Sequence, residues 1–154
     1  MLWKATFELW MYTLKNIPMI FWLKPRVLEL DTTRSVIVIP FRRRTRNHLN
    51  SMYFGALCVG ADLAPGLLTM TIIKSKRKKC SFIFKDFQSN FVRRCEADAK
   101  FICEEGHLIT KAIDQAVELR ERQDTTLSVT AVESTSGEVV AEFKMTISIK
   151  YLEK

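Results

Sequence analysis

The chain has 154 residues, which suits one domain and is long enough to bury a core without disulfide or metal support. Hydrophobic residues make up 47% and charged residues 27%, which are ordinary values for globular proteins and exclude a disordered or fibrous chain. The formal net charge of +7 predicts attraction to an anion. Charge alone does not distinguish a nucleic acid, a lipid surface and a phosphorylated small molecule.

The cysteines form no C-x-x-C pair and have no nearby His at metal-ligand spacing, so we predict neither a metal site nor a bound cofactor. They are Cys58, Cys80, Cys95 and Cys103. Each lies in or beside an apolar pattern, which favours small buried side chains. We find no secretory signal, and a reducing cytoplasmic setting is the expectation.

Residues 1–24 contain all three tryptophans but predict no transmembrane segment. The longest uncharged run, residues 16–23, is far shorter than the ~20 residues that span a bilayer. Apolar residues recur at helical spacing and predict an amphipathic helix that Pro18 ends or kinks. They are Trp3, Phe7, Trp10, Leu14 and Ile17. We expect this stripe to pack on its own domain or on a partner subunit, with membrane-surface binding as the alternative.

The expected domain, residues 25–154, begins with two β-rich segments at residues 26–31 and 35–41. Asn47 and Ser51 are candidate helix caps before an apolar run. Because residues 52–63 show almost no polar face, we expect a central helix surrounded by protein. Pro65 and Gly66 predict a kink or an end of this helix, although residues 67–73 can continue its apolar path.

The second half of the chain is mostly strand. Residues 80–88 begin one strand, and apolar and charged residues alternate strictly over residues 94–103. Residues 107–122 predict an exposed amphipathic helix. Residues 127–131 and 139–151 predict a hairpin joined through STSGE. The class is therefore α+β, with a largely antiparallel sheet of five or six strands curled around the central helix.

Asp62 is the only acidic residue between positions 32 and 85, a span rich in Lys and Arg. Three stretches, NHLNSMYFGALCVGAD, KDFQSNFVRRCEADAKF and VVAEFKMTISIK, resemble the hotdog-fold acyl-CoA thioesterases, in particular the phenylacetate-pathway branch. The resemblance covers residues 26–151 and leaves the N-terminal helix outside. It places Asn47 on the family Asn, Tyr53-Phe54-Gly55 on the family His-Gly-Gly, and Asp62 on the family acid. Tyr53 and Phe54 depart from that pattern.

The matched residues predict a catalytic site. Gly55 lies in the first helical turn, where its backbone N–H is free to hold a developing oxyanion. The resemblance implies that Asp62 is general base or nucleophile, that Asn47 orients water or the carbonyl, and that Tyr53 donates a hydrogen bond. It also implies a site shared across a dimer. The structural alternative for Asp62 is a buried acid that accepts backbone N–H groups or pairs with Arg. For Asn47 it is an N-cap, and for Tyr53 a core side chain.

Two groups of residues are candidate substrate-binding groups. Basic side chains before the helix are suited to the phosphates of coenzyme A. They are Arg42, Arg43, Arg44 and Arg46. We expect Met52, Leu57 and Phe84 to contact the acyl chain. The basic run at residues 74–79 favours an ordinary exposed turn.

The predicted function is hydrolysis of an acyl-CoA or acyl carrier protein thioester by a cytoplasmic homodimer or tetramer. A hotdog dehydratase is a weaker alternative because its Asp/His pair is not visible. A non-catalytic acyl-thioester or lipid-binding protein is the alternative from another class. Nucleic-acid binding has only the net charge in its favour, so we predict none.

Overall fold

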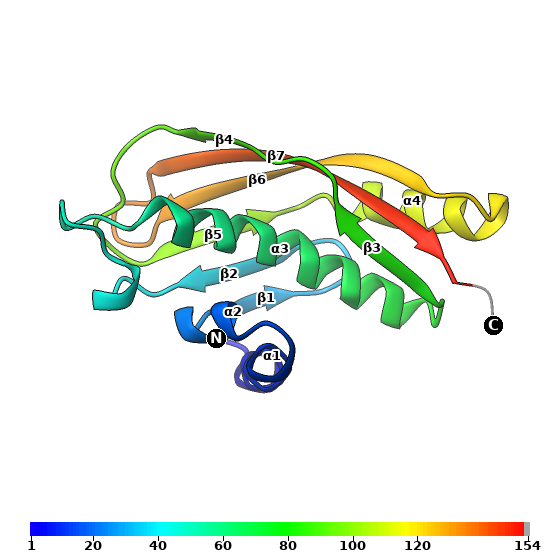
Figure 1. Ribbon diagram of the computed structural model, residues 1–154, viewed down its shortest axis with the longest axis horizontal. Helices are drawn as coiled ribbons and strands as arrows, with labels where there is room; N and C mark the ends of the chain where they lie inside the picture. Colours follow the sequence, from blue (N-terminus) through cyan, green and yellow to red (C-terminus); the bar gives the residue numbers. More distant parts are fainter. Residues whose placement is uncertain (153–154) are drawn as a thin grey trace.

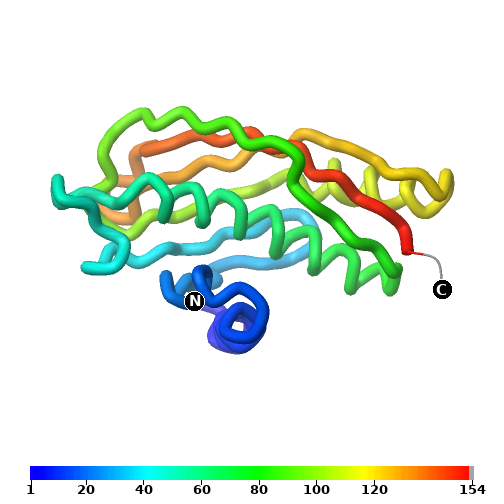
Figure 2. The backbone as a smooth tube through the Cα atoms, viewed as in Figure 1, coloured from blue at the N-terminus to red at the C-terminus, as the bar shows by residue number. Residues whose placement is uncertain are grey.

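The computed structural model describes residues 1–152 of the chain, whose helices and strands are arranged as in Figures 1 and 2. The helices are α1 (Trp3–Asn16), α2 (Pro18–Leu23), α3 (Phe54–Ser75) and α4 (Gly106–Leu119), with a 3-10 turn η1 at Arg43–Thr45. The strands are β1 (Arg26–Leu30), β2 (Ser35–Ile39), β3 (Cys80–Phe84), β4 (Gln88–Phe91), β5 (Ala99–Cys103), β6 (Gln123–Glu133) and β7 (Val139–Tyr151). The chain therefore contains both helices and strands, as the α+β prediction requires.

The strands form one antiparallel sheet in the order β1-β2-β5-β6-β7-β3. β3 and β4 pair with successive parts of β7, so together they act as one interrupted edge strand. The sheet curls over α3, which runs along its inner face (Figure 1). The predicted curled sheet wrapped around a central helix is confirmed.

The helix α3 is the centre of the core because it is apolar on nearly every side. Buried residues recur along its length, from Ala56 to Ile72. By length and composition α3 could cross a membrane, yet 56% of its most apolar stretch is buried inside this fold, as expected of a core helix. Gly60 lets the helix approach the sheet, because a Cβ there would lie 2.3 Å from a ring carbon of Phe101.

The sequence predicted a kink or an end of α3 at Pro65, and the structure shows that α3 does not end there. The helix runs on to Ser75, and Pro65 is itself buried. The hydroxyl of Thr69 donates to the Pro65 carbonyl at 2.8 Å. Burial of the apolar residues on both sides of the proline outweighs the loss of one helical hydrogen bond.

The strand predicted over residues 94–103 is shorter than expected and covers only β5. The preceding residues alternate in polarity but bond to side chains instead of a neighbouring strand. Glu133 accepts a hydrogen bond from the Glu96 backbone N–H at 2.8 Å, and Asp98 accepts one from the Phe41 backbone N–H at 2.8 Å. The ion-paired carboxylates of Glu133 and Asp98, together with single backbone hydrogen bonds to Met52 and Ser134, therefore hold this segment in place of a regular ladder.

The β6–β7 hairpin and α4 follow the predicted patterns. Inward positions of β7 from Ala141 to Ile149 are buried, and Glu142, Lys144 and Lys150 are exposed. α4 buries its apolar stripe, which is Ile109, Ala112, Ile113 and Ala116.

The N-terminal helices cover the β1 edge of the sheet. The Leu2 backbone N–H donates to the Val27 carbonyl at 2.8 Å, and Thr6 Oγ1 accepts the Val27 N–H at 3.0 Å. The face of α1 that meets the domain consists of Thr6, Leu9 and Thr13. Most of the predicted apolar stripe therefore does not pack on its own domain, since Trp3 and Phe7 are 71% and 62% exposed. Its packing on a partner subunit stays a prediction. Hydrogen bonds to the sheet edge, which a hydrophobicity pattern does not register, set the rotation of α1.

Candidate active site

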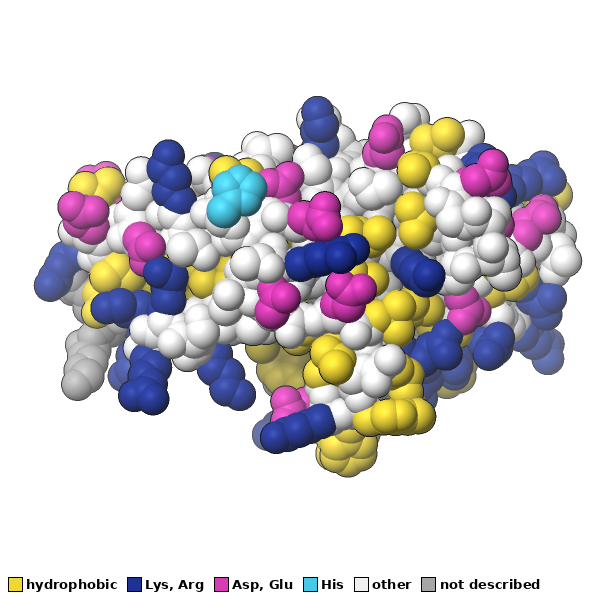
Figure 3. Space-filling model, turned by 180° about the vertical axis from the view of Figure 1, so that it is seen from behind, with side chains coloured by type: hydrophobic (Ala, Val, Ile, Leu, Met, Phe, Trp, Pro, Cys, Tyr) yellow, Lys and Arg dark blue, Asp and Glu magenta, His cyan; other side chains and the backbone are white. Residues whose placement is uncertain are grey.

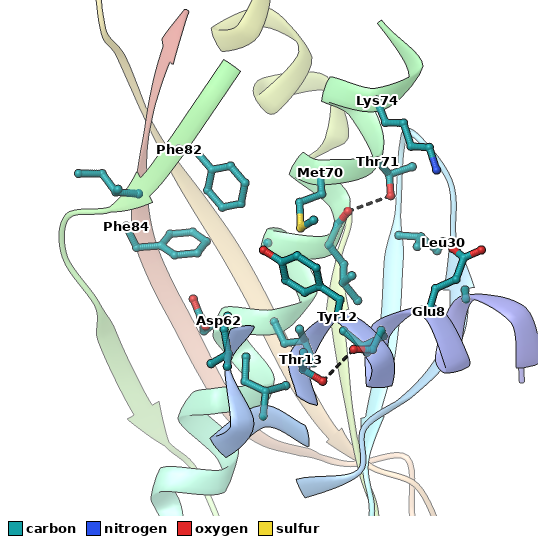
Figure 4. Close-up of a pocket in the computed structure, with 18 residues that line it drawn as sticks. Glu8, Tyr12, Thr13, Leu30, Asp62, Met70, Thr71, Lys74, Phe82 and Phe84 are labelled. Atoms are coloured by element: carbon teal, nitrogen blue, oxygen red, sulfur yellow. Dashed lines mark hydrogen bonds between the residues drawn. The ribbon is translucent and has the colours of Figure 1, made fainter. Parts of the chain in front are cut away.

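Asp62 lies in the middle of α3 and lines a pocket of about 540 Å³. The pocket is enclosed by α1 and α2 on one side, by α3 behind, and by β3 on the other side. Figure 4 shows Asp62 at one end, below Phe84, with Lys74 and Glu8 toward the opposite end. The volume lies within the ~300–1,000 Å³ range typical of small-molecule sites.

The pocket wall is mainly apolar. Leu9 lines it from α1. Met70 comes from α3, and Phe82 and Phe84 come from β3 (Figure 4). The two threonine hydroxyls in the wall already donate to backbone carbonyls of their own helices, Thr13 to Leu9 and Thr71 to Leu67. A long apolar ligand with one polar group near Asp62 would match this lining.

The Asp62 carboxylate has no hydrogen-bond or ion-pair partner among residues 1–152, which the structure describes. Its side chain is half-buried, and burial raises its pKa above the ordinary aspartate value. A carboxylate that was present only for stability would be expected to have a partner. Within residues 1–152, Asp62 is therefore neither paired with Arg nor bonded to backbone N–H groups, the two forms of the structural alternative.

Gly55 lies in the first turn of α3 but does not line this pocket. The first helical bonds run from the Ala56 and Leu57 N–H groups to the Tyr53 carbonyl, and the Gly55 N–H precedes them. Gly55 and Asp62 are separated by seven residues, or about 10 Å along the helix axis. Within one chain, Gly55 and Asp62 are therefore too far apart to contact the same small reacting group.

Tyr53 and Asn47 lie at the entrance to α3. Tyr53 is exposed, and its ring covers Gly55 so closely that a Cβ on Gly55 would lie 2.4 Å from the ring. The Asn47 side chain accepts the Leu49 and Ser51 backbone N–H groups at 2.9 Å and 3.1 Å. Asn47 therefore shapes the turn before α3, and α3 itself has no side-chain N-cap.

The candidate arginines lie around η1 and do not line the pocket. Arg44 lies over the Trp22 ring at 5.9 Å from its centroid, and Arg46 donates to Asn50 Oδ1 at 2.8 Å. Arg42 donates to the Phe41 carbonyl at 3.0 Å. The side chain of Arg43 is exposed.

Of the three side chains expected to contact an acyl chain, Phe84 lines the pocket. Met52 and Leu57 are buried in the core. Sequence reasoning missed the contribution of α1, including Leu9 and Tyr12, because its most apolar stripe faces away from the pocket.

The cysteine thiols are poor candidates for a nucleophile, because burial disfavours the reactive thiolate. Burial raises the pKa of the Cys95 and Cys103 thiols to about 11, and the half-buried Cys58 and Cys80 thiols also have raised pKa values. Within residues 1–152 there is no group of three or more His, Cys, Asp and Glu side chains placed to hold a metal ion.

A family model described as a domain of unknown function, DUF4442, matches residues 9–149. No curated protein matches the chain. A Pseudomonas aeruginosa structure described as a protein of unknown function and probable thioesterase has a TM-score of 0.80 and 24% identity, covering 94% of this chain and 95% of that one.

Two further structures support the hotdog fold at lower identity. A mutant thioesterase from Staphylococcus aureus has a TM-score of 0.69 and 12% identity, with 86% of this chain and 98% of that chain covered. A mutant of the phenylacetic acid degradation protein PaaI from Thermus thermophilus has a TM-score of 0.58 and 18% identity, with 85% and 97% covered. At these identities the likeness establishes the fold, which is the one that the sequence resemblance predicted.

Proposed function

The chain belongs to the DUF4442 family and has the hotdog fold, and we propose that it hydrolyses acyl thioesters with Asp62 as general base. One observation carries the proposal: an unpartnered carboxylate lines a mainly apolar pocket of about 540 Å³. Perturbed titratable groups inside such pockets are typical of active sites.

In this reaction Asp62 takes a proton from water as the water oxygen attacks the thioester carbonyl carbon. The C–S bond then breaks, and the thiolate leaving group takes up the proton from Asp62, so that the products are a carboxylic acid and a thiol. The raised pKa of Asp62 suits this role, because a base accepts a proton more readily as its pKa approaches the working pH. The reaction needs no metal ion.

The oxyanion would be held by the Gly55 N–H of a second subunit, because within one chain Gly55 does not line the Asp62 pocket. The free edge of the sheet supports such a dimer. α1 covers the β1 edge, whereas β3 and β4 have a neighbour on one side only among the described strands. Exposed Phe87 and Phe91 lie along that free edge, which is suited to pairing with a second copy.

The acyl chain would lie between α1 and β3, against Phe82, Phe84 and Met70. We keep Arg43 and Arg44 as proposed binding groups for the phosphates of coenzyme A, reached across the subunit boundary. Asn47 and Tyr53 would act through the shape of the loop that presents Gly55.

The test is thiol release by the purified protein from acyl-CoAs of graded chain length. The wild-type protein should hydrolyse at least one length class, and Asp62→Asn should lower kcat about 10²–10⁴-fold, the usual contribution of a general base. A non-hydrolysable thioether analogue should still bind this variant.

Asp114→Asn is the matched control, because Asp114 is an exposed carboxylate on α4 that pairs with Lys76 outside the pocket. It should leave kcat unchanged. A wild-type protein that binds acyl-CoA but hydrolyses none would contradict the enzyme and favour the binding protein. The absence of the His-Gly pair at Tyr53-Phe54 makes that the second candidate.

A further inference from the structure

The outward side of α1 and α2 presents a continuous apolar surface. We call it the outer apolar surface, and it consists of Trp3, Phe7, Met11, Leu14, Met19 and Trp22, all of which are exposed. The first four recur at spacings of three and four residues, so they share one face of α1. Seen from behind the view of Figure 1, large hydrophobic side chains project from the lower edge of the molecule (Figure 3).

This exposure does not come from a loosely attached helix. The opposite face of α1 is fixed to the β1 edge by the Thr6 hydroxyl, and Trp10 Nε1 donates to the Pro25 carbonyl at 2.7 Å. The inward face of α1 is thus fixed to the domain, and Trp3 on the other face is left outward. Exposed apolar clusters of this kind mark binding surfaces in folded proteins.

The charges around the outer apolar surface are mainly basic. Lys4, Lys15 and Lys24 lie in the same segment, and Arg44 lies over the Trp22 ring. In Figure 3, Lys and Arg side chains stand on both sides of the projecting apolar cluster, with one acidic side chain beside them on one side. Glu8, the one acidic residue in positions 1–28, is also exposed and lines the pocket, so the segment carries more basic than acidic side chains.

The combination of exposed tryptophans and basic side chains distinguishes between possible binding partners of this surface. A second copy docked symmetrically on the same surface would bring the two basic rims together, and like charges repel. An anionic bilayer matches both features: tryptophan rings favour the headgroup region, and Lys and Arg are attracted to acidic lipids. We propose that the outer apolar surface binds the headgroup region of a membrane containing anionic lipids.

Membrane binding here would be peripheral, through one face of α1 and α2, as for an interfacial amphipathic helix. The inner face of α1 lines the Asp62 pocket, so the bound membrane would lie directly outside the pocket wall. The proposal stands whether or not the pocket is catalytic.

The experiment is co-sedimentation of the full chain with large unilamellar vesicles. One set contains phosphatidylcholine alone, and the other contains phosphatidylcholine mixed with phosphatidylserine. We expect at least about tenfold tighter partitioning to the anionic vesicles, weakened by added salt. The fluorescence of the exposed Trp3 and Trp22 should shift to shorter wavelength on binding.

The double variant Trp3→Ala, Trp22→Ala should lose about tenfold or more of this partitioning. Leu119→Ala is the matched control, since Leu119 is exposed at the end of α4, and its partitioning should be unchanged. Because all three side chains are exposed, thermal unfolding of both variants should match the wild type.

Two results would overturn the proposal. The first is no sedimentation of the wild-type protein with anionic vesicles, or sedimentation equal in the double variant. The second is a wild-type assembly in gel filtration that becomes smaller in the double variant, which would assign the outer apolar surface to contact between copies.

Discussion

Replacing Asp62 by Asn should make the protein more stable at neutral pH. The two side chains have the same size, so the change removes a charge without opening a cavity. Because burial raises the pKa of Asp62, the folded chain binds this proton more tightly than the unfolded chain does. The free energy of unfolding of the wild type therefore decreases as pH rises from about 3.9, the pKa of aspartate in the unfolded chain, through the raised pKa of Asp62 in the folded chain.

The size of the effect follows from linkage. Each pH unit between the unfolded and folded pKa values costs the wild type about 1.4 kcal/mol of stability at neutral pH, and the Asn variant does not carry this cost. The difference in the free energy of unfolding between the two proteins should be near zero below pH 3.9. It should grow as pH rises to the raised pKa of Asp62 and stay constant above it. Other carboxylates, such as Glu133, contribute equally to both proteins and cancel in the difference.

Urea unfolding of both proteins at a series of pH values measures this difference, with Asp114→Asn as the control for loss of an exposed charge. A variant that is less stable than wild type at pH 7 would refute the reasoning. It would mean that Asp62 has a favourable partner in solution and is not a poised base.

Three further outcomes follow from the packing and the buried charges. In thermal unfolding, Gly60→Ala should destabilise the protein by about 1–3 kcal/mol, because the new Cβ would meet the Phe101 ring. Gly66→Ala should stabilise it by about 0.5–1 kcal/mol, because the space around Gly66 is open and Ala favours the helix. Glu133→Gln should cost about 1.5–3 kcal/mol at pH 7, and the loss should vanish on acidification through the lowered pKa of Glu133. The Cys103 thiol, with its pKa raised to about 11, should not react with iodoacetamide at pH 8 until the chain unfolds, as mass spectrometry would measure.

The main fold could be predicted from the sequence because its strongest patterns are also its largest elements. The all-apolar stretch from Met52 onward identified a buried helix, and the alternation up to Tyr151 identified the longest strand. The predictions failed where side chains bond to the backbone. Thr6 sets the rotation of α1, and Glu133 replaces a strand ladder beside Glu96, which polarity patterns do not reveal.

The candidate site could be predicted in part. Asp62 stood out as a lone acid in an apolar helix, and it does line the pocket. The wall formed by α1 could not be found, because Leu9 belongs to the less apolar side of that helix and the resemblance begins only after it. The roles of Gly55 and Asp62 across a subunit boundary stay a prediction.

The most direct test of the central claim is the pH dependence of kcat/KM for hydrolysis of the preferred acyl-CoA. We predict that kcat/KM falls about tenfold per pH unit below an apparent pKa that lies above the ordinary aspartate value of about 3.9. The wild type should lose stability relative to Asp62→Asn only up to this same pKa, above which the difference in the free energy of unfolding is constant. Hydrolysis that persists undiminished in the Asp62→Asn protein, with the same pH profile, would contradict the account.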